Sequence, residues 1–253
     1  MVSDIRLLLV IDICTFFPTV LAAAAVRKEI AENIPESRPP FAESLGQGWK
    51  AVTGNRGIFI LILVSSVMTC FMGSFQILAQ PIILSFADSA ALGIGETVCA
   101  SGMLVSSLFL GARGIRKGYV KKLSLSLLLA GAGMVGFGLR ENLYLICLFG
   151  FAFFAALPVA NNCLDYLVRT NIPDALQGRA WGVIGFLSQI GYVAAYSMAG
   201  IAADGIAARF HIGVGRGGAW VVMASGLLLG LMAALLSMLK SVQKLEELQC
   251  LKN

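Results

Sequence analysis

The sequence predicts an all-α, polytopic membrane protein with about seven membrane-spanning helices, and three observations lead to this fold class. Apolar residues make up 58% of the 253 positions, and only 13% are charged, about half the share found in soluble domains. The mean hydropathy is +0.83. The charged residues gather between long apolar runs, which is typical of bilayer-spanning helices joined by polar loops.

Seven apolar runs approach the length needed to cross a bilayer, which is about 20 residues in a helix. They cover residues 7–26, 57–86, 93–112, 123–139, 143–168, 180–203 and 218–239. The first run could instead be a signal peptide, because it ends in small residues. It is long, however, it contains Asp12, and Arg6 is the only basic residue ahead of it, so a spanning helix is the favoured interpretation.

Basic residues fall mainly on one side of the predicted membrane. The loops after the first, third and fifth runs, with the carboxyl-terminal tail, hold most of the lysines and arginines. Loops on the cytoplasmic side are enriched in these residues, so the amino end is predicted outside and the carboxyl end in the cytoplasm. The protein is therefore expected to be a multi-pass protein of the inner (plasma) membrane. These loops also account for the net charge of +5, and no nucleic-acid partner is expected.

The long loop at 27–56 has the features of a cytoplasmic linker. Its central prolines exclude a continuous helix, whereas 41–52 can form a short amphipathic helix on the membrane surface. The residues near the apolar face of that helix are Phe41, Leu45, Trp49 and Val52. A linker so close to an amino terminus is unusual, and further chain is expected before Met1.

The predicted organisation has four parts. They are a single spanning helix at 1–26, the cytoplasmic linker at 27–56, a six-helix transmembrane bundle at 57–239 and a cytoplasmic tail at 240–253.

Amide side chains inside the spans are the first candidate functional residues. Gln76 and Gln80 lie one helical turn apart in the second run. Asn161 and Asn162 lie deep in the fifth run, with Asn161 about 12 Å along the helix from Arg169. An amide at that depth needs a partner helix, a water-filled cavity or a ligand. Helix packing and cavity lining are both open on this evidence.

A third polar stretch lies in the sixth run, where Gln189, Tyr192 and Tyr196 follow one another at helical spacing. The two tyrosines could equally be packing residues. Glycines recur at three- to five-residue intervals in "GAGMVGFG", "GLLLG" and "GVIGFLSQIG", and they predict close helix packing.

Carboxylates inside the spans are few, and Asp12 and Asp165 are the clear candidates. Charges in a bilayer are costly and usually face protein or water. Asp165 precedes Arg169 by four residues, a spacing that favours an ion pair on one helix face. No catalytic set of nucleophile, base and acid can be assembled, and the six cysteines form no cluster with the single histidine. No enzyme activity, cofactor or metal site is expected.

Two loops resemble those of a known family. "IPDALQGRAWG" at 172–182 resembles the P-[DE]-x-x-x-G-R turn between the tenth and eleventh helices of major facilitator superfamily transporters, particularly the drug-efflux branch that includes macrolide exporters. "LFLGARGIRKGYVKK" at 108–122 resembles the basic loop between helices eight and nine, although no aspartate precedes Arg113 or Arg116. The chain would then correspond to helices six to twelve, with 7–26 as the sixth helix and 27–56 as the linker between two six-helix halves.

The resemblance implies secondary-active, proton-coupled efflux of small amphipathic molecules such as drugs, by rocking of two six-helix bundles around a central cavity. The expected partners are the lipid bilayer, the substrate and a missing amino-terminal half. One half of a cavity cannot alternate access, so the chain alone is expected to be inactive. The expected pathway residues are Gln76, Gln80, Asn161, Asn162 and Gln189, and the proton-coupling candidates are Asp12 and Asp165. The residues expected in the cytoplasmic gate are Arg113, Arg116, Lys117, Asp174 and Arg179.

Two other hypotheses remain. A non-transporting membrane subunit or fragment would share every feature of composition and topology. A seven-helix receptor would match the number of spans and the outside amino end, but 218–239 lacks the lysine that a retinal-binding member needs, and no cysteine pair is placed to join the outer loops.

Overall fold

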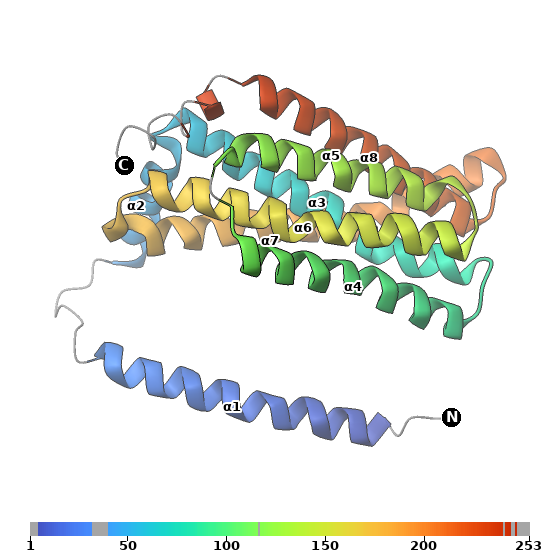
Figure 1. Ribbon diagram of the computed structural model, residues 1–253, viewed down its shortest axis with the longest axis horizontal. Helices are drawn as coiled ribbons and strands as arrows, with labels where there is room; N and C mark the ends of the chain where they lie inside the picture. Colours follow the sequence, from blue (N-terminus) through green and yellow to red (C-terminus); the bar gives the residue numbers. More distant parts are fainter. Residues whose placement is uncertain (1–4, 32–39, 116, 240, 244–245, 247–253) are drawn as a thin grey trace. The chain divides into compact units, whose positions relative to one another are not determined.

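The computed structural model describes residues 5–31, 40–115, 117–239, 241–243 and 246, and for 5–9, 11, 12, 26–31, 41 and 42 it describes the backbone alone. These residues form eight α-helices and no strand (Figure 1). The helices are α1 (Ile5–Ala31), α2 (Phe41–Thr53), α3 (Arg56–Leu84), α4 (Ser89–Arg113), α5 (Tyr119–Leu139), α6 (Leu143–Asn171), α7 (Asp174–Phe210) and α8 (Val214–Met238). The chain divides into two compact units, Met1–Glu43 and Ser44–Asn253.

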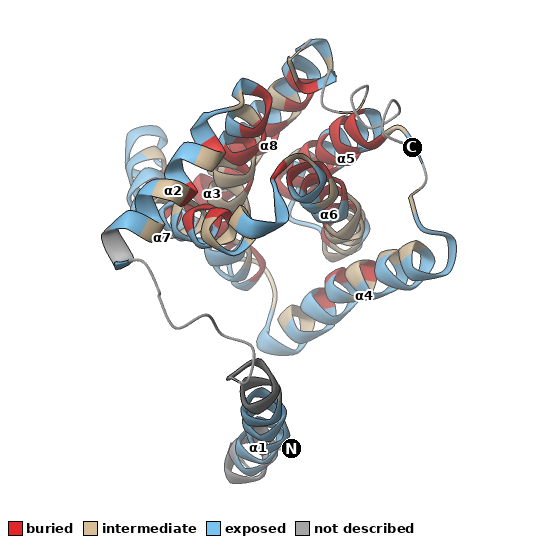
Figure 2. Cartoon of the chain, turned by 90° about the vertical axis from the view of Figure 1, so that its left-hand side faces the viewer, coloured by how far each residue is buried: buried red, intermediate tan, exposed pale blue. Residues whose placement is uncertain are grey.

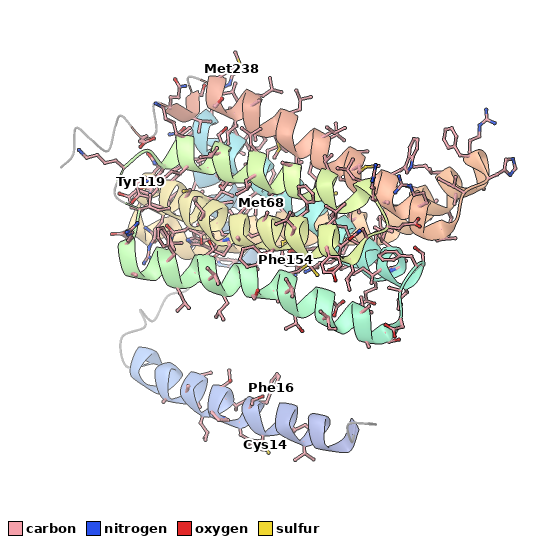
Figure 3. All side chains as sticks on the ribbon, turned by 45° about the vertical axis from the view of Figure 1, so that its right-hand side comes forward. Cys14, Phe16, Met68, Tyr119, Phe154 and Met238 are labelled. Atoms are coloured by element: carbon pink, nitrogen blue, oxygen red, sulfur yellow. The ribbon has the colours of Figure 1, made fainter. Side chains whose placement is uncertain are left out.

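The first unit contains α1, and the predicted span 7–26 lies inside this helix. Phe16 and Cys14 are among its exposed side chains (Figure 3). The stretch Ile13–Ala25 is apolar but shorter than a span, so membrane crossing by α1 stays a prediction.

In the second unit, α3 to α8 are six helices long and apolar enough to cross a membrane. The all-helical membrane fold is thus confirmed, with six such helices among the described residues where seven were predicted. The largest boundary error concerns the predicted run 180–203, which lies within the 37 residues of α7. Pro173 precedes α7 with a φ of −56°, and Asp174 in the first turn is favoured by the helix dipole, so the helix starts well before its apolar run.

The six helices pack as two groups joined through α8. α5 lies between α6 and α8, and α4 lies on the outer side of α6; α3 packs against α7 and α8 (Figure 2). Four aromatic rings join α3, α5 and α6 at the centre, where Phe75 stacks on Phe153 at 4.4 Å and meets Phe137 edge-on at 4.7 Å. Phe154 completes this cluster, and Figure 3 shows it within the bundle.

Glycines bring some of these helices into backbone contact, as predicted. A Cβ added to Gly226 of α8 would lie 2.6 Å from the carbonyl oxygen of Gly131 in α5, and the reverse distance is also 2.6 Å. Gly191 of α7 lies similarly close to α3. The prediction is wrong for Gly182 and Gly185, which are exposed and have nothing within 4 Å of an added Cβ, and for Gly230, where an added Cβ would meet only Leu128 at 3.9 Å.

The amphipathic helix predicted at 41–52 is present as α2. Its predicted apolar face divides in two. Val52 is fully buried in the core of the second unit, whereas Leu45 and Trp49 are about half exposed, at 49% and 48%.

Candidate functional site

Seven polar side chains lie at positions inside the apolar helices and are exposed on the six-helix bundle. We call this set the polar face, and its residues are Gln76, Gln80, Glu96, Asn161, Asn162, Asp165 and Gln189. They come from α3, α4, α6 and α7. We call the end of the bundle that holds α2, the α4–α5 loop and the α6–α7 turn the basic end, and the opposite one the far end (Figure 1).

Hydrogen bonds join three helices in the far-end half of the polar face. The Tyr196 hydroxyl of α7 donates to Oε1 of Gln76 at 3.0 Å. Nε2 of Gln80 donates to Oε1 of Glu96 in α4 at 3.3 Å. The two glutamines of α3 therefore bridge its neighbours on both sides.

Sequence reasoning missed Glu96. It lies inside the predicted run 93–112, but near its start, where it passes for a residue of the preceding loop. The structure places it seven residues inside α4, about 10 Å from that helix end. Hydropathy alone does not show where α4 begins. In the structure Asp88 is the N-cap, and its side chain accepts a hydrogen bond from the Ala91 amide at 2.9 Å.

The asparagines occupy a different depth from the glutamines. Gln76 lies about 12 Å from the far end of α3, whereas Asn161 lies about 15 Å from the basic end of α6, at 1.5 Å per helical residue. The two amide pairs therefore lie in opposite halves of the bundle, although the sequence assigned both simply to the interior of a span.

Neither Asn161 nor Asn162 has a hydrogen-bond partner among the residues that the structure describes. Hydrogen bonds from these side chains to a neighbouring helix therefore do not explain why amides occur at these positions. An amide inside a span with no protein partner must reach water, a ligand or another protein chain.

Asp165 lies one turn further toward the basic end, and the ion pair expected with Arg169 is not formed. Both side chains are exposed, and an exposed pair gains too little energy to hold two long side chains in place. The end of α6 is instead joined to the next helix, because Nε2 of Gln177 donates to the Arg169 carbonyl at 3.1 Å.

Gln189 extends the polar face onto α7, where it is exposed and has no hydrogen-bond partner within the described ranges. The tyrosines on the same side of the helix do have partners. Tyr192 donates to the Met72 sulfur at 3.4 Å, and its ring centre lies 5.9 Å from that of Tyr196. Each tyrosine therefore packs through its ring and hydrogen-bonds through its hydroxyl, so it is both a packing residue and part of a polar stretch.

The predicted gate residues lie at the basic end, but not all lie in loops. Arg113 is the last residue of α4, with its guanidinium 4.9 Å from the centre of the Phe109 ring, and Lys117 is exposed beyond it. Asp174 and Arg179 belong to the first turns of α7, which corrects their assignment to a loop. The predicted residues outside the description are Arg116, as a whole, and the side chains of Asp12 and Phe41.

Two charged side chains hold the ends of α5, and neither was predicted. At the basic end, the Glu246 carboxylate accepts from the amides of Gly118, Tyr119 and Val120 at 2.6, 3.0 and 3.2 Å. At the far end, Arg216 donates to the last carbonyls of α5, those of Gly138 and Leu139, both at 3.1 Å. An anion at a helix amino end and a cation at its carboxyl end both interact favourably with the helix dipole.

Comparison with known proteins gives no relative: no family model, no curated protein and no solved structure matches the chain.

Proposed function

We propose that this chain is part of a membrane transporter of the major facilitator type, which moves small amphipathic molecules out of the cell in exchange for protons. The polar face would line the pathway, and a second six-helix bundle would close it from the other side. The loop resemblance at 108–122 and 172–182 supports the family.

The observation that carries the proposal is the pair Asn161 and Asn162. At a similar depth, about 15 Å from the basic end, α5 and α8 expose Leu129 and Leu228. Those leucines suit acyl chains, whereas an unpartnered amide in hydrocarbon costs at least 1–3 kcal/mol by rough estimate. Polar side chains on α6 and leucines on α5 and α8 therefore indicate different surroundings, water or protein for the first and lipid for the second.

In the proposed mechanism, the amides on the polar face hydrogen-bond the substrate or its water, first in one half of the membrane and then in the other. Asn161, Asn162 and Gln189 are available to a ligand from the basic end. Gln76 and Gln80 exchange their bonds with Tyr196 and Glu96 for bonds to the ligand as the bundles rock. Proton coupling is assigned to Asp165 and Asp12.

The sidedness follows the basic loops. The basic end faces the cytoplasm of a plasma membrane under this proposal, because lysines and arginines gather there. Arg113, Arg116, Lys117, Asp174 and Arg179 then form the cytoplasmic rim that separates and closes as the bundles move.

Reconstitution tests the proposal. The purified chain is placed in proteoliposomes alone, and together with any six-helix membrane chain that co-purifies with it. Uptake of a fluorescent quaternary ammonium compound, which has no neutral form to cross the bilayer unaided, is driven by a pH gradient. We expect uptake only with the second bundle, and loss of uptake in the Asn161→Leu, Asn162→Leu double variant. The lipid-facing variant Leu228→Ala is the control that keeps activity.

Each other outcome would count against a definite part of the proposal. Uptake by the chain as a demonstrated monomer would refute the need for a second bundle. A co-purified complex that neither binds nor moves any probe in a panel of amphipathic compounds would favour the non-transporting membrane subunit.

A further inference from the structure

The helix α2 has two different sides, and one of them is firmly docked. A Cβ added to Gly48 would lie 2.6 Å from the carbonyl oxygen of Arg179 in α7, so only glycine permits this approach. The Arg179 guanidinium donates to Oε1 of Gln47, and Val52 is fully buried. From Ser44 onward, α2 runs across the basic end of the bundle, in front of α3 and α7 (Figures 1 and 2).

The strip of α2 next to the docked one is apolar and about half exposed. Leu45 and Trp49 lie one helical turn apart and are exposed by 49% and 48%. Lys50 follows them and is exposed as well. In the first two turns of α3, Phe59 and Leu63 are also exposed, by 40% and 56%.

We propose that the Leu45 and Trp49 side of α2 lies in the lipid leaflet at the basic end, at the boundary between headgroups and acyl chains. A helix that lies across the spans at the level of their ends is placed at this boundary. Tryptophan is enriched there, and amphipathic helices bury their apolar side to about 5–10 Å. The cations of Lys50 and Arg56 extend toward anionic headgroups.

The docked side of α2 connects this lipid contact to α7. Because Gln47 and Gly48 hold Arg179 at the start of α7, the leaflet and α7 are connected through one short helix. Arg179 is thereby fixed relative to the membrane surface, and this holds whether or not the bundle transports anything.

Fluorescence quenching by brominated lipid tests the proposal. The variant Trp181→Phe, Trp220→Phe leaves Trp49 as the only tryptophan and is reconstituted in phosphatidylcholine and phosphatidylglycerol vesicles. Bromine is placed either near the headgroup end or near the middle of the acyl chain. We expect strong quenching of Trp49, and more of it from the shallow bromine than from the deep one.

Two further variants keep the test decisive. The single-tryptophan variant that retains Trp181, which packs against the core, is the protein-covered control and should be quenched much less. If either double variant fails to fold, Trp49→Phe in the otherwise native chain should lower the fraction quenched by the shallow bromine, and Trp220, which is exposed by 45%, should account for the remaining quenching.

Leu45→Asp in the Trp49-only variant should weaken the quenching at least severalfold. An unquenched Trp49 with the emission of an indole in water would overturn the proposal. So would an unquenched Trp49 with the emission of a protein-covered indole, because a protein partner would then occupy this side of α2.

Discussion

The contact between α5 and α8 differs from the polar face in how its polar groups are satisfied. Along α5 and α8, backbones touch at Gly131 and Gly226, and the Ser124 hydroxyl donates to the Ala233 carbonyl at 2.6 Å. On the polar face, Asn161 has no partner among the described residues. The first region satisfies its polar groups inside the protein, whereas the second leaves the amides of Asn161, Asn162 and Gln189 available.

The difference separates stability from function in this chain. Because lipid is as apolar as leucine, membrane helices gain stability from close packing and internal hydrogen bonds, both of which the α5 and α8 pair has in full. The amides of Asn161, Asn162 and Gln189 make no hydrogen bond within the described bundle and add none of this stability. Changes in the first region should therefore unfold the protein, and changes in the second should alter what it binds.

The largest effect is expected at the backbone contact. Gly226→Ala places a Cβ 2.6 Å from a carbonyl oxygen that cannot move without its helix, and it should cost about 3 kcal/mol of unfolding free energy or prevent folding. Gly230→Ala is the matched control four residues away, because its Cβ meets only Leu128 at 3.9 Å. Unfolding of the purified variants in detergent measures both. Equal losses would contradict the close contact.

Loss of the carboxylate at the start of α5 should have the next largest effect. Glu246→Ala removes the acceptor of three backbone amides, and Gly118 as the N-cap residue provides no side chain to replace it. We expect a loss of about 1–2 kcal/mol, with faster hydrogen exchange at Tyr119 and Val120. Glu246→Gln keeps an acceptor oxygen and should lose less. Unchanged exchange in the alanine variant would show that the tail carboxylate does not hold α5.

A smaller loss is expected at the other end of α5. Arg216→Ala removes two hydrogen bonds to terminal carbonyls and should cost about 1 kcal/mol. Arg209→Ala removes an exposed arginine with no described hydrogen bond and should change the unfolding free energy by less than about 0.5 kcal/mol. The same detergent unfolding measures this pair, and the prediction fails if Arg209 proves the more costly of the two.

The smallest effect on stability belongs to the polar face. Asn161→Leu and Asn162→Leu remove amides that the bundle does not use, so each should leave the unfolding free energy within about 0.5 kcal/mol or raise it. Ser124→Ala, which leaves the Ala233 carbonyl without its donor, should cost more than either, by about 1 kcal/mol. A large loss in the asparagine variants would mean that these amides stabilise the bundle after all.

Local patterns in the sequence predicted the helices well. All seven apolar runs became helices, and six of these are long and apolar enough to span a membrane, because a run of about 20 apolar residues bounded by polar ones has few alternatives in a membrane. The helix that contains the fifth run ends at Asn171, two residues before Pro173. The start of α7 at Asp174 was missed because hydropathy does not register a polar first turn, which a helix readily accepts.

Local patterns in the sequence could not predict contacts between residues that are distant along the chain. The sequence placed Gln76 and Tyr196 on polar stretches of separate spans, but their bond joins positions 120 residues apart. The cap that Glu246 gives to α5 joins residues 126 to 128 apart. Such pairs depend on which helices are neighbours, and no periodicity within one helix contains that information.

Water access to the polar face tests the central claim most directly. Asn162→Cys and Leu129→Cys lie at similar depths on α6 and α5, and each is made in a chain whose six native cysteines are replaced by alanine or serine. A membrane-impermeant thiol reagent is added to membranes that carry either variant. A thiolate forms in water and not in lipid, so Asn162→Cys should react at least about tenfold faster than Leu129→Cys. Equal, slow reaction at both positions would contradict a water-filled pathway on the polar face.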